Sequence, residues 1–221
     1  MIKTSGATIT HTGWDMVEAE RADVHAFLSS LVPSQWDVPS VCEGWRVRDV
    51  AAHMLVDEPL RELGVPRAVM KAIGFRMSVH RINAWWIERN YSRDPTSIVQ
   101  AFDGPFVPGG ISKKLGPSGV LRGLVIHHQD MRRSLGVPRT VPTDRVVRVL
   151  ERALTQEGSR NLGSYERGVG LRLQADDIEW SSGSGPLVHG TIEALLMSIA
   201  GRPCALAELS GDGLEVLEPE D

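Results

Sequence analysis

The sequence lacks the features that mark several large classes of protein. Its two cysteines, Cys42 and Cys204, lie far apart and outside any Cys-x-x-Cys spacing, so neither a disulfide framework nor a thiolate zinc site is indicated. We interpret each as a small buried hydrophobic residue. The longest apolar stretch, 194–200, is far shorter than the roughly 20 residues that span a bilayer. Residues 1–11 are polar and lack the apolar region of a signal peptide. We therefore expect a soluble, cytoplasmic protein with no membrane partner.

A strong excess of charge of either sign is also missing. The chain has 24 basic and 28 acidic side chains and a formal net charge of -4. Nucleic-acid binding needs a clustered positive surface, so we expect no nucleic-acid partner. A glycine-rich phosphate loop and a dinucleotide fingerprint are absent as well. What remains is ordinary globular composition: 42% of the 221 residues are hydrophobic and 24% are charged, enough for a sizeable core.

Helical spacing of apolar residues dominates the first 160 residues. It predicts a helix from Gly13 that ends near Pro33, then helices over 47–58, 69–91, 118–135 and 144–157, and a short one through Val99 and Phe102. Residues 34–45 and 104–119 are predicted to be loops because glycine and proline punctuate them. Several amphipathic helices joined in this way indicate a helical bundle.

The pattern changes in the C-terminal part of the chain. Residues 170–174 and 178–182 alternate apolar and polar side chains, as half-buried strands do, and 187–189 form a candidate third strand. A helix over 190–201 follows. We therefore predict a mainly α protein, with a four-helix bundle over residues 1–160 and a small strand-strand-helix α+β region over 161–221 docked on it.

Two histidines on the predicted 118–135 helix are candidates for chemistry. His127 projects into the middle of the apolar face that Leu124 and Met131 help to define, and His128 lies at its edge. A buried imidazole needs a partner for each ring nitrogen, which is either a hydrogen bond or a metal ion. Position on the helix leaves both explanations open.

A third histidine, His53, lies beside the apolar stripe of the 47–58 helix. Asp49 and Asp57 stand four residues before and after it and share one row of the helix with it. A carboxylate in such a row either orients a metal-bound histidine or binds the metal itself, and the row can equally be a hydrogen-bonded surface. Arg81 and Asn83, on the 69–91 helix, are within reach of a cleft or are solvated.

Two stretches of the sequence carry a family resemblance. Residues 34–53, from Ser34-Gln35-Trp36 to His53, and residues 126–138, from Ile126-His127-His128 to Pro138, resemble the metal-binding domain of mycothiol-dependent maleylpyruvate isomerases. The segment 190–209 looks like the end of chains in this group. The resemblance implies a DinB-like four-helix bundle that carries a divalent metal, usually zinc, with ligands that match His53 and His127.

The sequence departs from the family pattern at one position. The family places a carboxylate one turn before its second histidine, and this chain has Gly123 there. A catalytic zinc commonly has three protein ligands and an open position, so another group must supply the third ligand or the metal binds weakly. Asp57 is the preferred substitute because it lies one turn from His53, and Asp49 is spatially similar.

Other substitutes for the missing carboxylate stay open. Asp130 or Glu58 would supply an oxygen, and His128 would supply a nitrogen instead. Asp130, three residues after His127, would also fit behind that histidine as a hydrogen-bond partner.

The resemblance implies a mycothiol-dependent transferase or isomerase. The metal would bind the thiol of mycothiol, lower its pKa and present a thiolate to a small electrophilic substrate, with Arg81 or Asn83 in contact with cofactor or substrate. Gly123 favours an alternative, a non-catalytic relative that has lost the metal and binds a small molecule or a protein. A third hypothesis is a metal-dependent hydrolase that uses zinc-bound water. An exposed apolar face would allow a homodimer.

Overall fold

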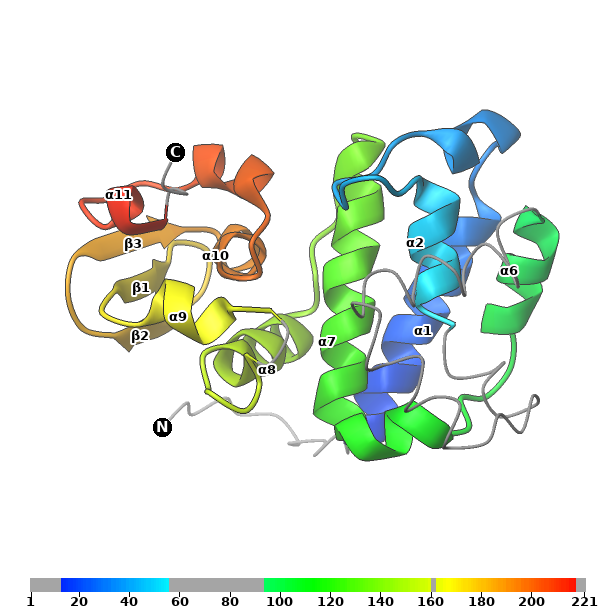
Figure 1. Ribbon diagram of the computed structural model, residues 1–221, viewed down its shortest axis with the longest axis horizontal. Coiled ribbons are helices and arrows are strands. Elements are labelled where there is room, and N and C mark those ends of the chain that lie inside the picture. Colours follow the sequence, from blue (N-terminus) through cyan, green and yellow to red (C-terminus); the bar gives the residue numbers. More distant parts are fainter. Residues whose placement is uncertain (1–12, 56–93, 160–161, 218–221) are drawn as a thin grey trace, which may run out of the picture.

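The computed structural model of the chain describes residues 13–55, 94–159 and 162–217 (Figure 1). Its helices are α1 (Gly13–Ser29), α2 (Val47–His53), α6 (Pro95–Phe102), α7 (Gly110–Ser134), α8 (Thr143–Ala153), α9 (Ser164–Gly168), α10 (Ile192–Ile199) and α11 (Leu214–Leu217), with the 3₁₀ helices η1 (Pro33–Asp37) and η2 (Pro203–Glu208). The strands are β1 (Arg172–Ala175), β2 (Ser181–Gly183) and β3 (Leu187–Gly190).

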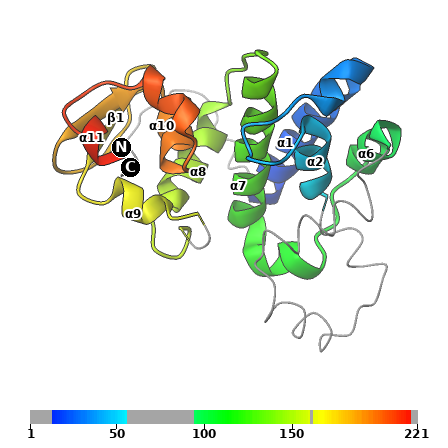
Figure 2. The same cartoon turned by 45° about the horizontal axis from the view of Figure 1, so that its top comes forward.

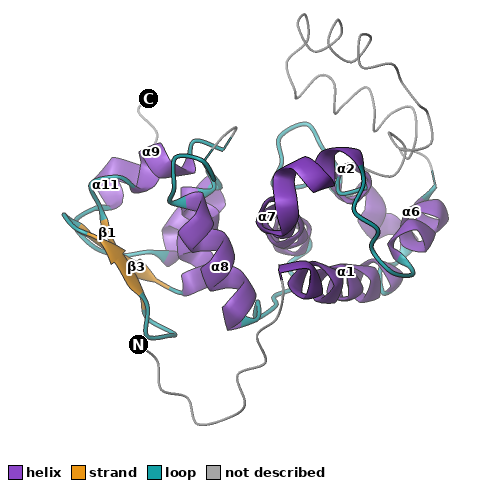
Figure 3. Cartoon of the chain, turned by 90° about the horizontal axis from the view of Figure 1, so that it is seen from below, coloured by secondary structure: helices purple, strands orange, loops and turns teal. Residues whose placement is uncertain are grey.

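Four helices, α1, α2, α6 and α7, pack around one another as a bundle (Figure 3). Helix α7 contacts α1 and α2, and α6 contacts the same two helices on the other side. Each helix buries one apolar stripe in the bundle interior, with Val17, Val50, Ile98 and Leu124 as examples that are at most 4% exposed.

Local sequence signals set the ends of these helices. Asp94 caps α6 by accepting hydrogen bonds from the backbone N–H groups of Thr96 and Ser97, and Pro95 occupies the first helical position. Gly136, at φ +63°, ends α7, and the N–H of Val137 donates to the carbonyl of Arg132. This turn directs the chain out of the bundle and toward α8.

The C-terminal elements form a second lobe beside α7 (Figures 1 and 2). Strand β1 is central in the order β2-β1-β3, and it pairs antiparallel with β2 and parallel with β3. Helix α10 is apolar on nearly every side and packs against the sheet, α8, α9 and η2. Helix α8 contacts both α7 and α10, so it links the bundle to the sheet.

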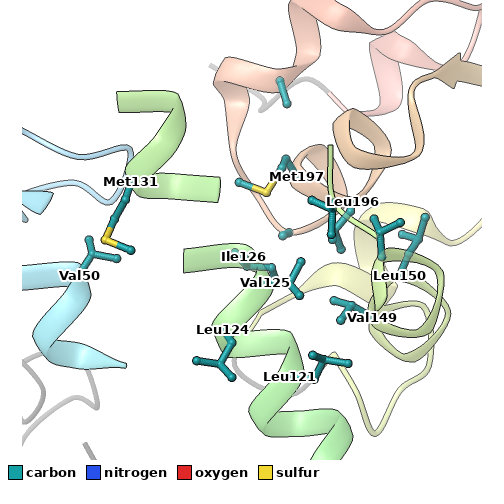
Figure 4. Close-up of a cluster of buried hydrophobic side chains, with 14 of the residues drawn as sticks. Val50, Leu121, Leu124, Val125, Ile126, Met131, Val149, Leu150, Leu196 and Met197 are labelled. Atoms are coloured by element: carbon teal, nitrogen blue, oxygen red, sulfur yellow. The ribbon is translucent and has the colours of Figure 1, made fainter. Parts of the chain in front are cut away.

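Apolar side chains of α7 point to both sides of the molecule (Figure 4). Met131 extends toward Val50 of α2, whereas Val125 faces Val149 of α8 and the side chains of α10, such as Leu196. All five side chains are at most 1% exposed. Burial of apolar surface stabilises a fold by about 25 cal/mol per Å². Because α7 buries apolar side chains against α2 on one side and against α8 and α10 on the other, it holds the two lobes together.

The predicted fold class is confirmed: the chain is mainly α, a four-helix bundle with a small α+β region at its C-terminal side. The predicted helices that begin at residues 13 and 47 are observed, as are those near residues 99, 118–135, 144 and 190–201. The predicted helix over 69–91 and the end of the one over 47–58 lie outside the described residues. The domain boundary at residue 160 stays a prediction.

Three local predictions differ from the structure. Residues 104–119 are not one loop, because α7 already begins at Gly110. Gly116, at φ +65°, and Pro117 kink the helical segment instead of ending it, so the same two residues that indicate a loop produce a bend. The strand predicted over 178–182 forms later, as β2 at 181–183, and β1 begins two residues later than expected, at Arg172.

None of the described helices is long and apolar enough to cross a membrane.

Candidate metal centre

The imidazoles of His53 and His127 meet between α2 and α7. Their ring centroids are 5.0 Å apart and the rings stand edge to face at 84°. The indole of Trp45 also contacts His53, with ring centroids 4.9 Å apart. Helix α2 presents His53 in its last turn because Val47, Val50 and Ala51 bury the opposite face of the helix in the core. Two residues 74 positions apart in the sequence therefore form one site.

Asp130 supports His127 from behind. Its Oδ2 lies 3.0 Å from Nδ1 of His127, one helical turn away, and the carboxylate is fully buried. Burial alone would raise the pKa of Asp130, but hydrogen bonds from His127 and Arg202 hold that pKa well below its usual range. An ionised Asp130 accepts the proton of Nδ1, which leaves the lone pair of His127 on Nε2.

Arg202 reaches Asp130 from the second lobe, in the turn that follows α10. Its Nε and Nη2 donate to the two carboxylate oxygens at 3.0 and 2.8 Å. A guanidinium that pairs with a carboxylate in this two-point geometry holds it firmly. The orientation of His127 therefore depends on a contact between the two lobes.

The thiol of Cys42 completes this group, which we call the Asp130 cluster (Cys42, His127, Asp130 and Arg202). Its Sγ donates to Oδ2 of Asp130 at 3.1 Å and lies 3.9 Å from Nδ1 of His127. Ligand atoms of Cys42, His127 and Asp130 lie within 4.8 Å of one another, close enough to hold a metal ion. Nη2 of Arg202, however, lies 2.8 Å from Oδ2 and 3.9 Å from Sγ, so an ion there would meet a guanidinium charge at close range. We therefore interpret the cluster as a hydrogen-bonded group.

Both cysteines are disfavoured as thiolates. Burial raises the pKa of Cys42 to about 12, and the negative charge of Asp130 adds to the effect. Burial also raises the pKa of Cys204. The sequence contains no other cysteine, so the thiolate form is disfavoured for every cysteine of the chain.

His128, the neighbour of His127, belongs to a different group. Its Nδ1 donates to Glu20 of α1 at 3.0 Å, and its Nε2 accepts from Nε of Arg132 at 2.8 Å. Arg139 and Arg145 donate to the same carboxylate at 2.7 and 2.8 Å. We call these five residues the Glu20 network. The sequence placed His128 at the edge of the apolar face, yet its side chain is fully buried, whereas that of His127 is 19% exposed.

The Glu20 network carries two strong pKa shifts. Burial would raise the pKa of Glu20, but hydrogen bonds from His128 and Arg139 outweigh it and lower the value to about 2. Burial lowers the pKa of His128 to about 4, although Glu20 opposes this shift. His128 is therefore neutral at pH 7, with both nitrogens already hydrogen-bonded.

The other predicted site residues have different surroundings. Asp49 caps α2: its carboxylate accepts from the backbone N–H and the guanidinium of Arg46 at 2.9 Å. At Gly123, a Cβ would have no atom of the described residues within 4 Å. The remaining candidates, Asp57, Glu58, Arg81 and Asn83, lie outside the described residues.

Sequence reasoning missed several residues of these two groups. Cys42 was interpreted as a simple hydrophobic residue, and Arg202 and Glu20 were given no role. Glu20 follows four residues after Met16 and four before Val24 on the apolar side of α1, which is a signal for a buried acid. Arg202 offers no such signal, because its partner Asp130 is 72 residues away.

Comparisons with known proteins agree with this fold. Residues 17–105 match the family model of the mycothiol maleylpyruvate isomerase N-terminal domain. The solved structure of a mycothiol-dependent maleylpyruvate isomerase matches with a TM-score of 0.60 and 15% identity, over 94% of this chain and 95% of that chain. A histidine-to-alanine mutant of such an isomerase matches with a TM-score of 0.58, at the same identity and coverage. No curated protein matches the sequence.

The fold defines the class of protein first: a helical bundle with a small α+β lobe, the fold of the two solved isomerase structures. The match of residues 17–105 to the model of the mycothiol maleylpyruvate isomerase N-terminal domain supports the resemblance seen in the sequence. This matched segment contains His53 and Cys42 and ends before α7, so His127 and Asp130 are placed by the structure alone.

Proposed function

We propose that this chain is a mycothiol-dependent metalloenzyme, an isomerase or thiol transferase that acts on a small electrophilic molecule. In this proposal His53 and His127 hold a divalent metal ion, with zinc preferred because imidazole nitrogens suit it. The observation that carries the proposal is the contact of these two imidazoles, 5.0 Å between ring centroids, with the carboxylate of Asp130 behind one of them. A bound metal would supply the positive charge that stabilises a thiolate near neutral pH.

The donor set fits such an ion at His127. Asp130 fixes the proton of this imidazole on Nδ1, so the lone pair of Nε2 is free for a metal. Carboxylate–histidine pairs of this kind orient a ligand and make it more basic. Arg202 holds Asp130 in turn, and Cys42 donates a third kind of hydrogen bond to the same carboxylate.

In this proposal the reactive thiol comes from outside the chain. Cys42 keeps its proton because burial and Asp130 raise its pKa to about 12, and burial raises the pKa of Cys204. These raised pKa values support a small-molecule thiol as the nucleophile in this proposal, in agreement with the name of the matched family. The partners proposed here are that thiol and an electrophilic substrate.

The third metal ligand is a further part of the proposal. Gly123 supplies none, and Asp130 already accepts hydrogen bonds from three side chains. Asp57 stays the preferred donor from the sequence. The roles of Arg81 and Asn83 in binding cofactor or substrate, the homodimer and the cytoplasmic location also stay predictions.

The proposal is tested by metal and thiol binding together. Protein freed of metal would be titrated with Co²⁺, and mycothiol would then be added while the visible spectrum is recorded. We expect about one equivalent of Co²⁺ and a thiolate-to-cobalt absorption that appears only with mycothiol. Both signals should disappear in His53→Ala and persist in His189→Ala, the control, whose histidine pairs with Asp176 in the second lobe. Absence of metal uptake by the wild type would overturn the metalloenzyme proposal.

A second candidate function is a binding protein that has lost the metal. Gly123 supports it, because this residue offers no ligand where the family pattern has a carboxylate, and no atom of the described residues lies within 4 Å of a Cβ built there. Protein that takes up no metal and still binds a small molecule would support this alternative. The hydrolase hypothesis has less support, since Asp130, the carboxylate beside His127, is fully engaged and unsuited to be a general base.

A further inference from the structure

A separate cavity lies between the C-terminal end of α7 and the second lobe. Its volume is about 290 Å³, near the lower end of the range for small-molecule sites. Gln129, Arg132 and Arg133 of α7 line one side, and Glu193 of α10 and Glu208 of η2 line the other. Neither His53 nor His127 lines this cavity.

One side of the cavity presents an oriented guanidinium. Nε of Arg132 donates to Nε2 of His128 at 2.8 Å, and the guanidinium carbon lies 4.3 Å from the centre of the Phe27 ring. These two contacts fix the side chain. Its two terminal nitrogens, Nη1 and Nη2, donate to none of the residues that the structure describes. They are available to a carboxylate, which a guanidinium binds with two parallel hydrogen bonds.

The charge behind this guanidinium is not fully compensated. Arg139 and Arg145 pair with the carboxylates of Glu20 and Asp23, and Arg132, a third positive charge, lies within electrostatic range of the same two carboxylates. Burial lowers the pKa of Arg132, and the positive charge of Arg139 lowers it further. This side of the cavity therefore favours a negatively charged group.

On the opposite side of the cavity, negative charge exceeds positive charge. Glu193 and Glu208 share one guanidinium, that of Arg133, and the side chain of Glu208 is 46% exposed. Gln129 donates to Glu193 at 2.8 Å, which leaves its buried carbonyl oxygen without a hydrogen-bond donor among residues 13–55, 94–159 and 162–217. Two carboxylates and this unsatisfied acceptor favour a positively charged donor.

We propose that this cavity binds a small zwitterion of the α-amino acid class. The carboxylate of the ligand pairs with Arg132, and its ammonium group faces Glu208 and Glu193. Val137 and Pro138 complete the lining with apolar surface for a small side chain. The proposal is independent of the metal centre, since no residue that it uses belongs to the Asp130 cluster.

The test is calorimetric titration of the full chain with the common α-amino acids. For the amino acid that binds best we expect a dissociation constant in the millimolar range or tighter, about -4 kcal/mol at 1 mM. Probes that lack one charge make matched controls: for L-alanine these are propionate and ethylamine, and each should bind at least about tenfold more weakly, as expected when a charge-assisted hydrogen bond is lost.

Variants locate the site. Arg132→Gln and Glu208→Gln should each weaken binding about tenfold or more, and Glu179→Gln, an exposed acid in the second lobe, should leave it unchanged. Circular dichroism of each variant verifies that it is folded. Absence of binding at about 10 mM, equal binding of the acid without the ammonium group, or binding that both variants retain would each overturn the proposal. Metal content is measured in parallel, so its loss is distinguished from loss of this site.

Discussion

Two consecutive histidines on α7 have opposite surroundings. The side chain of His127 is 19% exposed and meets His53, whereas that of His128 is fully buried and bonded to Glu20 and Arg132. Neighbours on a helix project about 100° apart, so one faces α2 and the other faces α1. The residue type is the same, and the partners differ: His127 has a carboxylate at Nδ1, which suits the metal ligand that we propose, whereas His128 has hydrogen-bond partners at both nitrogens, as a structural residue does.

The strongest way to break this contrast is to remove the acid of the Glu20 network. Glu20→Gln leaves Arg139 and Arg145 without the buried carboxylate that both contact. We expect a loss of about 3–5 kcal/mol in the free energy of unfolding, because removal of one partner leaves uncompensated buried charge. Urea unfolding measures it. Glu157→Gln, whose side chain is 70% exposed in its pair with Arg152, is the control and should cost at most about 1 kcal/mol.

The Glu20→Gln variant also tests whether the Glu20 network is independent of the proposed metal site. Folded variant protein should still bind metal at His53 and His127, since Glu20 contacts neither residue in any described hydrogen bond. A loss below about 1 kcal/mol would contradict the importance assigned to the network.

The same network makes stability depend on pH in the acid range, with a smaller effect. His128 has a folded pKa of about 4 against 6.5 for the unfolded chain, so between these values the unfolded state binds the extra proton and stability falls as pH falls. Glu20, with a folded pKa of about 2 against 4.5, adds a further loss as pH drops below 4.5. Urea midpoints between pH 7 and pH 4 measure the first loss. His128→Ala should flatten it, and an unchanged slope in that variant would assign the loss to other groups.

The smallest predicted effect concerns His127 and its partner Asp130. Asp130→Asn removes the charge that holds the proton of His127 on Nδ1 and leaves Arg202 without its ion pair. We expect metal affinity to fall by about 10–100-fold, as for other hydrogen-bond partners of metal ligands. Competition with a chelator of known affinity measures this. Asp176→Asn, in the exposed pair with His189, is the matched control. Equal affinity in the wild type and Asp130→Asn would remove Asp130 from the site.

The sequence predicts the helices and the two candidate ligands better than their surroundings. Apolar spacing is a local property, so α1, α2 and α10 follow from it, and His53 and His127 follow from the family resemblance. The kink at Gly116 does not, because glycine and proline indicate a loop and a bend equally.

The polar partners depend on contacts distant in sequence. Cys42 and Arg202 approach Asp130 from 88 and 72 residues away, and His128 meets Glu20 across 108 residues. Helical periodicity carries no information on such pairs, and it placed His128 at the edge of the apolar face for this reason. Packing of α1, α2 and the second lobe on α7 decides which histidine is buried.

The most direct test of the account compares His127→Ala with His128→Ala. Metal content and urea stability would be measured for both variants and the wild type, purified without chelator or affinity-tag metal. We predict that His127→Ala loses the metal and keeps stability within about 1 kcal/mol once both proteins are metal-free, whereas His128→Ala keeps the metal and loses about 1–3 kcal/mol. Full metal content in His127→Ala, or loss of metal in both variants alike, would contradict the account.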